Sequence, residues 1–248
     1  MEKIAIYNNK GGVGKSTIAA NLSHGLAELE LNTLLIDLDE QRDSEFLLGF
    51  DDEDIENTIY HLYNDSNLND CIYKARDGLD LLSNSNMEQL EESWMNENLE
   101  NLLYDLLIKI YDVDYDYVII DCSPSKRSKI NHAILHYVDH ILVPIQTEIM
   151  SVKNIKNIYQ KLTELNISHE KVKMIIPNMH DKRTNMSKNN LSNIKEFFND
   201  ENEIVTPPIN RRVAIAEAGE KGKSVFEHDN KGAVQFYDVL EQVVTNLG

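Results

Sequence analysis

The sequence has few cysteines, no long apolar run and a shortage of basic residues. Only two cysteines, Cys71 and Cys122, occur among 248 residues, which argues against a disulfide framework or a zinc ribbon. No apolar run reaches the roughly 18 residues of a membrane span, and no charged segment followed by an apolar leader is present. These absences predict a cytoplasmic protein in a reducing setting.

Basic residues are scarce and unevenly placed. The chain carries 24 Lys and Arg against 42 Asp and Glu, a formal net charge of -18. Residues 1–120 hold 7 basic and 26 acidic residues, whereas the remainder holds 17 and 16. The acidic average would speak against nucleic acid as a partner, but it conceals a C-terminal half in which basic residues match acidic ones in number.

A glycine-rich segment near the N-terminus predicts a phosphate-binding loop. It reads NNKGGVGKST over residues 8–17 and lies between a β-branched run and an amphipathic stretch. Glycine permits backbone angles that turn successive N–H groups toward phosphate oxygens at the start of a helix. In such a loop Lys15 would reach the β- and γ-phosphates and Ser16 would ligate Mg²⁺. The alternative interpretation of the segment is a tight turn that binds no ligand. The predicted nucleotide-binding residues are Gly11, Gly12, Val13, Gly14, Lys15, Ser16 and Thr17.

One position departs from the general P-loop pattern G-x-x-x-x-G-K-[ST]. Asn9 stands where the pattern has its first glycine, and Lys10 follows it. The string K-G-G-x-G-K-[ST] resembles the deviant Walker A motif of the ParA/MinD family of ATPases. The resemblance implies ATP and Mg²⁺ as cofactors and a homodimer in the ATP state. It also implies that Lys10 acts on the phosphates bound by the partner subunit.

Apolar periodicity on both sides of the loop predicts an α/β fold. Residues 3–8 favour a strand, residues 16–31 a helix with one apolar stripe, and residues 33–37 a second buried strand. This order is a βαβ unit, so we expect a single doubly wound, mostly parallel sheet with helices on both faces. One domain spanning residues 1–248 is expected. Further expected elements are a strand near residues 79–83, a long helix over 87–111 and a helix over 149–165.

Two acidic segments follow apolar strands. Residues 37–41 read DLDEQ and resemble the family signature D-x-D-P-Q, with Glu40 in the proline position. The resemblance gives Asp39 the role of orienting the attacking water and places Asp37 near the metal, although a simple helix cap is the alternative. A second apolar run ends in Asp121, the Walker B arrangement that holds Mg²⁺. The predicted catalytic residues are Lys10, Lys15 and Asp39, and the predicted metal ligands are Ser16, Asp37 and Asp121.

Three later segments resemble the same family. V-P-x-Q-x-E occurs at residues 143–148, a short apolar run at 174–176 precedes Asn178, and Pro207 opens the string PPINRRV. In relatives the asparagine after this strand lies near the adenine base. The resemblance therefore adds Asn178 and Pro207 to the expected nucleotide-binding residues.

The basic residues of the C-terminal half fit a DNA-binding role. Partition-type members of the family bind duplex DNA nonspecifically as ATP dimers, and a basic ParB-like partner stimulates hydrolysis. Side chains that meet only phosphate would bind without sequence preference and weaken steeply with salt. The alternative is a set of scattered, solvated cations. The candidate DNA-binding residues are Arg183, Lys188, Lys195, Arg211 and Arg212.

Within the family the chain most resembles small ParA/Soj-type partition ATPases that lack an N-terminal helix-turn-helix domain. Such a protein would associate with the nucleoid in its ATP form. MinD-like members use a basic amphipathic C-terminal helix on membranes, but residues 234–247 contain Asp238 and Glu241 and no Lys or Arg. We therefore expect that helix to pack on the core and expect no membrane partner. A metabolite kinase or ligase of the same fold is a further alternative, which Lys10 disfavours.

Overall fold

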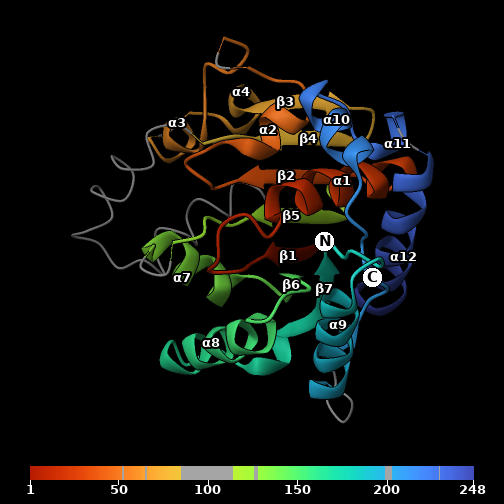
Figure 1. Cartoon of the computed structure of the whole chain (residues 1–248). Helices are drawn as coiled ribbons and strands as arrows, with labels where there is room; N and C mark the ends of the chain where they lie inside the picture. Colours follow the sequence, from red (N-terminus) through yellow and green to blue (C-terminus); the bar gives the residue numbers. More distant parts are fainter. Residues whose placement is uncertain (52, 65, 85–113, 126–127, 199–202, 229) are drawn as a thin grey trace.

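A single eight-stranded sheet forms the centre of the structure (Figure 1). The computed structural model describes residues 1–51, 53–64, 66–84, 114–125, 128–198, 203–228 and 230–248. The strands are β1 (Glu2–Ile6), β2 (Thr33–Asp37), β3 (Ile72–Arg76), β4 (Leu79–Leu82), β5 (Tyr117–Asp121), β6 (His140–Gln146), β7 (Val172–Asn178) and β8 (Ile204–Val205). Their order is β3-β4-β2-β5-β1-β6-β7-β8. Every pairing is parallel except the β3–β4 hairpin, which confirms the predicted mostly parallel, doubly wound sheet.

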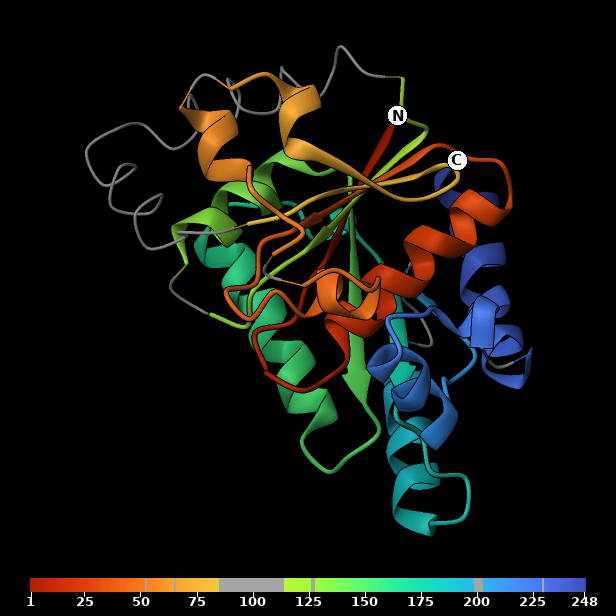
Figure 2. The ribbon, with the colours of Figure 1, turned by 90° about the horizontal axis from the view of Figure 1, so that it is seen from above.

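Helices cover both faces of this sheet (Figure 2). They are α1 (Lys15–Glu28), α2 (Asp43–Leu47), α3 (Ile59–Tyr63), α4 (Leu68–Cys71), α7 (Lys129–Tyr137), α8 (Ser151–Glu164), α9 (Asn185–Phe197), α10 (Val213–Glu220), α11 (Val225–His228) and α12 (Asn230–Leu247), with a short 3-10 turn at His169–Lys171. Apolar side chains of α1, α11 and α12 share one core, and those of α3, α4, α7, α8 and α9 share the other. The two cores lie on opposite faces because side chains alternate along each strand.

The first strand illustrates this alternation. Ile4 and Ile6 belong to the core beneath α1, whereas Ala5 and Tyr7 belong to the core on the other face. All four are at most 1% exposed. A strand with both faces buried is expected to be mostly apolar, and the central residues of β1, β2 and β5 have this character.

The C-terminal helix packs on the core, as the sequence predicts. Phe236, Leu240, Val243 and Leu247 of α12 are buried together with α1, whereas Val244 is 38% exposed. Among the described residues, no helix combines the length and apolar character needed to cross a bilayer.

Several boundaries differ from the sequence-based expectations. The predicted helix 16–31 begins at Lys15 and ends at Glu28, because Glu30 adopts φ 62° and the Leu31 N–H closes onto the Leu26 carbonyl at 3.2 Å. The hairpin strand β3 was not anticipated. The predicted helix over residues 87–111 lies outside the described residues.

Candidate active site

The predicted phosphate-binding segment forms a loop between β1 and α1. Gly12 and Gly14 adopt φ 71° and φ 90°, in the left-handed region that favours glycine. A Cβ atom on Gly14 would lie 2.3 Å from Nδ2 of Asn178, so a larger residue does not fit. Helix α1 begins at Lys15, and no side chain in the described part of the chain caps its N-terminus. The N–H groups of its first turn can therefore receive an anion.

Amide side chains from the two neighbouring strand ends hold this loop in place. Nε2 of Gln146, at the end of β6, donates to the Gly12 carbonyl at 2.7 Å. Nδ2 of Asn178, at the end of β7, donates to the Val13 carbonyl at 2.8 Å. Asn178, expected near the base, thus also fixes the backbone of the phosphate loop.

Two aspartates meet at the carboxyl ends of adjacent strands. Asp37 of β2 and Asp121 of β5 are register partners, and both are fully buried. The Asp37 carboxylate accepts the amides of Asp39 at 2.9 Å and Ser44 at 3.0 Å. Oδ2 of Asp121 accepts the Ser44 hydroxyl at 2.7 Å, whereas its Oδ1 is buried and has no hydrogen-bond partner among the described residues.

The electrostatics of this pair fit a divalent cation. Burial and the nearby Asp121 hold the pKa of Asp37 well above its usual range. Burial raises the pKa of Asp121 to about 6, although the Ser16 and Ser44 hydroxyls and Lys15 act in the opposite direction. A cation would relieve both carboxylates and give Oδ1 of Asp121 a partner. Oxygen ligands of this kind suit Mg²⁺.

The three predicted metal ligands do not enclose an ion by themselves. Within the described part of the chain, no group of three or more His, Cys, Asp or Glu side chains is arranged to hold a metal. Ser16, Asp37 and Asp121 would supply only part of the oxygen ligands of a Mg²⁺ ion. Mg²⁺ commonly binds one or two carboxylates and completes its coordination with waters and substrate phosphates. A site made of Ser16, Asp37 and Asp121 is consistent with this coordination.

A cavity of about 400 Å³ opens over the phosphate loop. Its lining consists of Gly11, Gly12, Gly14, Lys15, Ser16, Thr17, Asp39, Gln41, Asp43, Phe46, Leu47, Pro124 and Met179. Asp39 is only 7% exposed, and its carbonyl accepts Nδ2 of Asn84 at 2.7 Å. Burial and the nearby Asp39 raise the pKa of Asp43, against the effect of Lys15. Asp39, Asp43 and Lys15 therefore line the same cavity.

A second, more apolar cavity of about 240 Å³ adjoins the first. It is lined by Thr17, Leu47, Asn178, Met179, Ile209, Asn210, Arg211, Arg212, Ile215, Ala216 and Phe236. Thr17, Leu47 and Met179 border both cavities. An apolar recess that continues from a phosphate site has the character expected for a nucleotide base.

Lys10 points away from the phosphate cavity of its own chain. Its Nζ forms an ion pair with the Glu148 carboxylate and donates to Oε1 of Gln146 at 3.3 Å. The side chains of Lys10 and Glu148 are 41% and 38% exposed. Lys10 therefore lies at the surface beside the phosphate loop, and it is absent from the cavity lining.

A third cavity, of about 720 Å³, gathers basic side chains. Its lining is His180, Asp181, Lys182, Arg183, Asn210, Arg211, Arg212, Val213, Ala216, Lys231 and Gln235. We call it the cationic cavity, because five of these residues are Lys or Arg and only Asp181 is acidic. Arg183 is paired with Asp181, with Nη2 to Oδ2 at 2.8 Å, and this pairing holds the pKa of Asp181 well below its usual range.

The structure brings together some of the predicted DNA-binding residues and separates others. Arg183, Arg211 and Arg212 line the cationic cavity, whereas Lys188 and Lys195 are exposed on α9 outside it. Pro207, expected near the nucleotide, is exposed and borders none of the three cavities described above.

Several residues at the site were not anticipated from sequence. We call the cavity over the phosphate loop and the adjoining apolar cavity the nucleotide cavities. Asp43 borders the first of them, Leu47 and Met179 border both, and Lys182 and Lys231 line the cationic cavity. Asp43 lies only four residues after Asp39, and this spacing could have drawn notice. The others come together only through the fold.

The fold and the site define a P-loop nucleotide-binding protein, and comparisons with known proteins specify it further. Residues 1–176 match the model of a family described as an AAA domain. The chromosome partitioning protein ParA of Myxococcus xanthus is 30% identical over 236 residues, which cover 92% of this chain and 82% of ParA. The chain belongs to the ParA/MinD family of deviant Walker A ATPases.

Solved structures share the fold over nearly the whole chain. A plasmid partition protein from Borrelia burgdorferi B31 bound to AMPPNP has a TM-score of 0.81 at 22% identity, covering 98% of each chain. Cobyrinic acid a,c-diamide synthase from Mycobacterium smegmatis with ADP and magnesium has a TM-score of 0.81 at 25% identity, covering 100% of this chain and 95% of that one. Similar folds therefore bind an ATP analogue in one case and ADP with magnesium in the other.

Proposed function

We propose that this chain is a single-domain partition ATPase. It dimerises with ATP, binds duplex DNA without sequence preference, and uses partner-stimulated hydrolysis to position a plasmid, a chromosome or another cargo. One observation carries the proposal: the cavity that suits a nucleotide base shares Asn210, Arg211, Arg212 and Ala216 with the cationic cavity. A nucleotide in one cavity and a polyanion in the other would thus contact the same short segment.

Nucleotide binding follows from the geometry of the two cavities. The N–H groups at the start of α1 and the Lys15 ammonium would receive the phosphates. Ser16, Asp37 and Asp121 would hold Mg²⁺, which neutralises charge on the phosphates. The base would enter the adjoining apolar cavity between Met179 and Ile215.

Hydrolysis would rest on positioning and electrostatic stabilisation. Asp39 faces the phosphate cavity and would orient the attacking water for in-line displacement. Lys15, together with Lys10 of the partner subunit, would stabilise the charge of the transferring phosphoryl group. Because Lys10 stands apart from its own cavity, one chain alone lacks this contribution. We therefore expect slow turnover by the single subunit and faster turnover with DNA and a partner.

The DNA-bound state would place the protein on the nucleoid within the cytoplasm. The cationic cavity would meet the phosphate backbone, and Lys188 and Lys195 would extend this contact along α9. A ParB-like partner with a basic activating segment would suit the acidic N-terminal half of the chain. Hydrolysis would then separate the dimer and reduce its affinity for DNA.

Two other functions are less well supported. A MinD-like membrane role needs a free basic amphipathic helix, but the apolar side chains Phe236, Leu240 and Val243 of α12 are buried in the core. A metabolite kinase or ligase of the same fold is disfavoured, because Lys10 lies outside the cavity of its own chain, where it fits the dimer that the family resemblance implies.

The first experiment is binding to random-sequence duplex DNA with ATP, with ADP and without nucleotide, at low and moderate salt. Anionic liposomes serve as a parallel arm. We expect salt-sensitive DNA binding that requires ATP. Liposome binding without DNA binding would overturn the proposal in favour of the membrane branch, and binding to neither would overturn both.

A further inference from the structure

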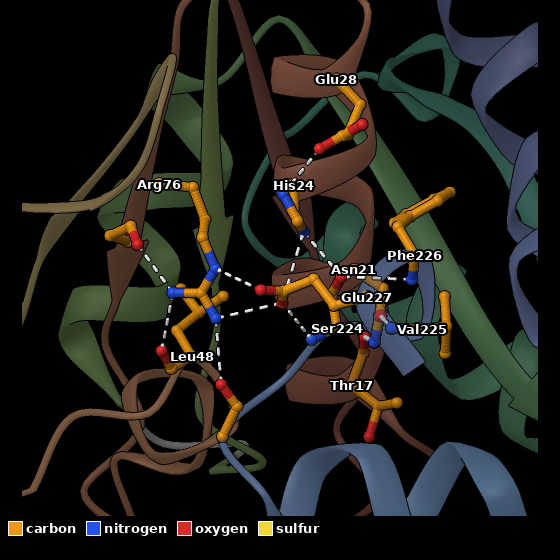
Figure 3. A network of polar contacts seen from close by, with 12 residues as sticks. Thr17, Asn21, His24, Glu28, Leu48, Arg76, Ser224, Val225, Phe226 and Glu227 are labelled. Carbon is orange, nitrogen blue, oxygen red and sulfur yellow. Dashed lines mark hydrogen bonds and ion pairs between the residues drawn. The ribbon is translucent and has the colours of Figure 1, made fainter. Parts of the chain in front are cut away.

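A partly buried polar cluster connects β3, α1 and the segment that leads into α11 (Figure 3). Arg76, at the end of β3, donates from Nε to Oε1 of Glu227 at 3.0 Å and from Nη2 to Oε2 at 3.1 Å. Oε2 of Glu227 also accepts the Ser224 amide at 2.8 Å. The Ser224 hydroxyl contacts Nδ1 of His24, on α1, at 2.6 Å. We call Arg76, Glu227, Ser224 and His24 the Arg76 cluster.

The Arg76 cluster joins segments that are distant in sequence. The Arg76 guanidinium also donates to the carbonyls of Leu48 and Gly222, both at 3.0 Å. Leu48 follows α2, and Gly222 follows α10. A single side chain from the edge hairpin therefore fixes the ends of two helices to each other, and Figure 3 shows these contacts converging on one guanidinium.

Glycines allow the same two helix ends to approach closely. A Cβ on Gly219 of α10 would lie 2.3 Å from Cδ2 of Leu47, and a Cβ on Gly222 would lie 2.4 Å from Cα of Gly49. Leu47 borders both nucleotide cavities. The backbone of α10 is therefore pressed against α2 at the point where the two cavities meet.

The position of α10 matters because it forms a wall of the apolar cavity. Ile215 and Ala216 of α10 line that cavity, and Arg212 immediately precedes the helix. None of the four residues of the Arg76 cluster lines either nucleotide cavity. Their effect on a nucleotide would be indirect.

The cluster contains one ion pair, Arg76 with Glu227, and a buried imidazole, His24. His24 is 3% exposed, and burial lowers its pKa although Glu227 and Glu28 act in the opposite direction. Burial raises the pKa of Glu227, but hydrogen bonds from Arg76 and the Ser224 amide outweigh this and hold it below its usual range. A bidentate arginine–carboxylate pair fixes geometry as well as charge. Such a pair is suited to holding one helix at a set position.

We propose that Arg76 and Glu227 are positioning residues that hold α10 in place as a wall of the apolar cavity. They would thereby determine how much the base contributes to nucleotide affinity. The inference rests on the proposed nucleotide-binding function. Loosening α10 would widen the apolar cavity while leaving the phosphate loop, Lys15 and the acidic residues in place. The base would then be held less tightly, whereas the triphosphate would keep all its partners.

The test compares binding of ATP with binding of inorganic triphosphate, both with Mg²⁺, by calorimetry. Arg76→Ala and Glu227→Ala should each weaken ATP binding by roughly 2- to 30-fold, a range typical of residues that act on a site through others. Both should leave the affinity for triphosphate unchanged. Lys74→Ala is the matched control, because Lys74 is a cation on the same strand that pairs with Asp77 instead. It should alter neither affinity.

The conservative variant Arg76→Lys keeps the charge but removes the bidentate pairing, so it serves if Arg76→Ala does not fold. It should show the same selective loss in smaller measure. An unchanged ratio of the ATP and triphosphate affinities in a folded variant would overturn the inference. Equal loss of both affinities would overturn it as well, because the effect would then be general. If the unaltered protein bound neither ligand, the proposed function itself would fail.

Discussion

Lys10 is paired with Glu148 of its own chain, although 138 residues separate them in sequence. The family resemblance implies that Lys10 acts on the phosphates bound by the partner subunit. In this structure Lys10 instead contacts Glu148 and Gln146 of its own chain. Both members of the ion pair are more than one-third exposed, so the contact is weak. Dimerisation would require Lys10 to exchange one anionic partner for another.

We predict that Glu148→Gln strengthens ATP-dependent dimerisation. Exposed ion pairs contribute about 0.2–1 kcal/mol, and two would be broken per dimer, so the dimer constant should rise roughly 2- to 30-fold. Sedimentation with a slowly hydrolysed ATP analogue measures this. Glu164→Gln is the control, because Glu164 is an exposed acid at the end of α8, the helix that follows Glu148, and it lies 4.0 Å from Lys161. Lys10→Ala should bind ATP without dimerising. Weaker dimerisation by Glu148→Gln would mean that Glu148 orients Lys10 for its partner.

The second prediction concerns Asp39→Ala. The backbone of Asp39 is held through its amide by Asp37 and through its carbonyl by Asn84, and alanine keeps both contacts. We therefore expect intact folding, ATP binding and dimerisation, with hydrolysis reduced by about 10²- to 10⁴-fold. Phosphate release under partner-stimulated conditions is the measurement. Asp43→Asn, at the second acid of the same cavity, should retain more activity. Brisk hydrolysis by Asp39→Ala would remove Asp39 from the mechanism.

The third prediction separates backbone strain from steric conflict in the phosphate loop. Gly14→Ala places a side chain in a left-handed conformation, which costs about 1–2 kcal/mol, and drives its Cβ into Asn178. We expect a larger loss of stability than strain alone gives, measured by urea unfolding, together with loss of ATP binding. In an Asn178→Ala background the steric conflict is absent, so Gly14→Ala should lower the free energy of unfolding only by the cost of the backbone strain.

Gly11→Ala provides the control for this series, because no described residue other than its two chain neighbours has an atom within 4 Å of the added Cβ. It should leave the free energy of unfolding nearly unchanged. Equal destabilisation by the alanine variants of Gly11 and Gly14 would contradict the steric argument.

The fourth prediction concerns Arg211 and Arg212 in the cationic cavity. Replacing either with alanine should weaken binding to all duplex sequences alike, because phosphate contacts carry no sequence information. The slope of log K against log salt should become shallower by about one unit for each phosphate that the variant no longer neutralises. Lys74→Ala, at the opposite edge of the sheet, should leave affinity and slope unchanged. An equal effect of Lys74→Ala would mean that only total charge matters.

The centre of the fold is predictable because its signals are local. The β1–α1–β2 unit follows from apolar runs and glycines, and the residues of β2 were predicted without error. The pairing of Asp37 with Asp121 also follows, because the carboxyl ends of parallel strands converge. Strand β3 escaped notice because it is a half-buried edge strand whose sequence, IYKAR, carries charged residues.

Long-range partners account for what the sequence could not reveal. The contacts of Glu148 with Lys10 and of Glu227 with Arg76 join residues 138 and 151 positions apart, and no local pattern marks either pair. The string V-P-x-Q-x-E drew attention to residues 143–148 without indicating what they contact. The lining of the apolar cavity likewise includes residues of α2 and α10, which the fold alone brings together.

The last prediction concerns His24 and pH. Burial lowers the pKa of His24 below the 6.5 of a free imidazole, although Glu227 and Glu28 favour its protonation and Arg76 opposes it. The unfolded chain therefore takes up a proton at higher pH than the folded one, so stability is full above pH 6.5 and falls as pH drops toward the folded pKa. His24→Gln removes this proton and should flatten the pH dependence of Tm in that window. Ser224→Ala removes the hydroxyl partner but keeps the imidazole, so its Tm should fall at every pH while retaining the wild-type slope. A slope in His24→Gln equal to that of the unaltered protein would show that other groups carry the acid sensitivity.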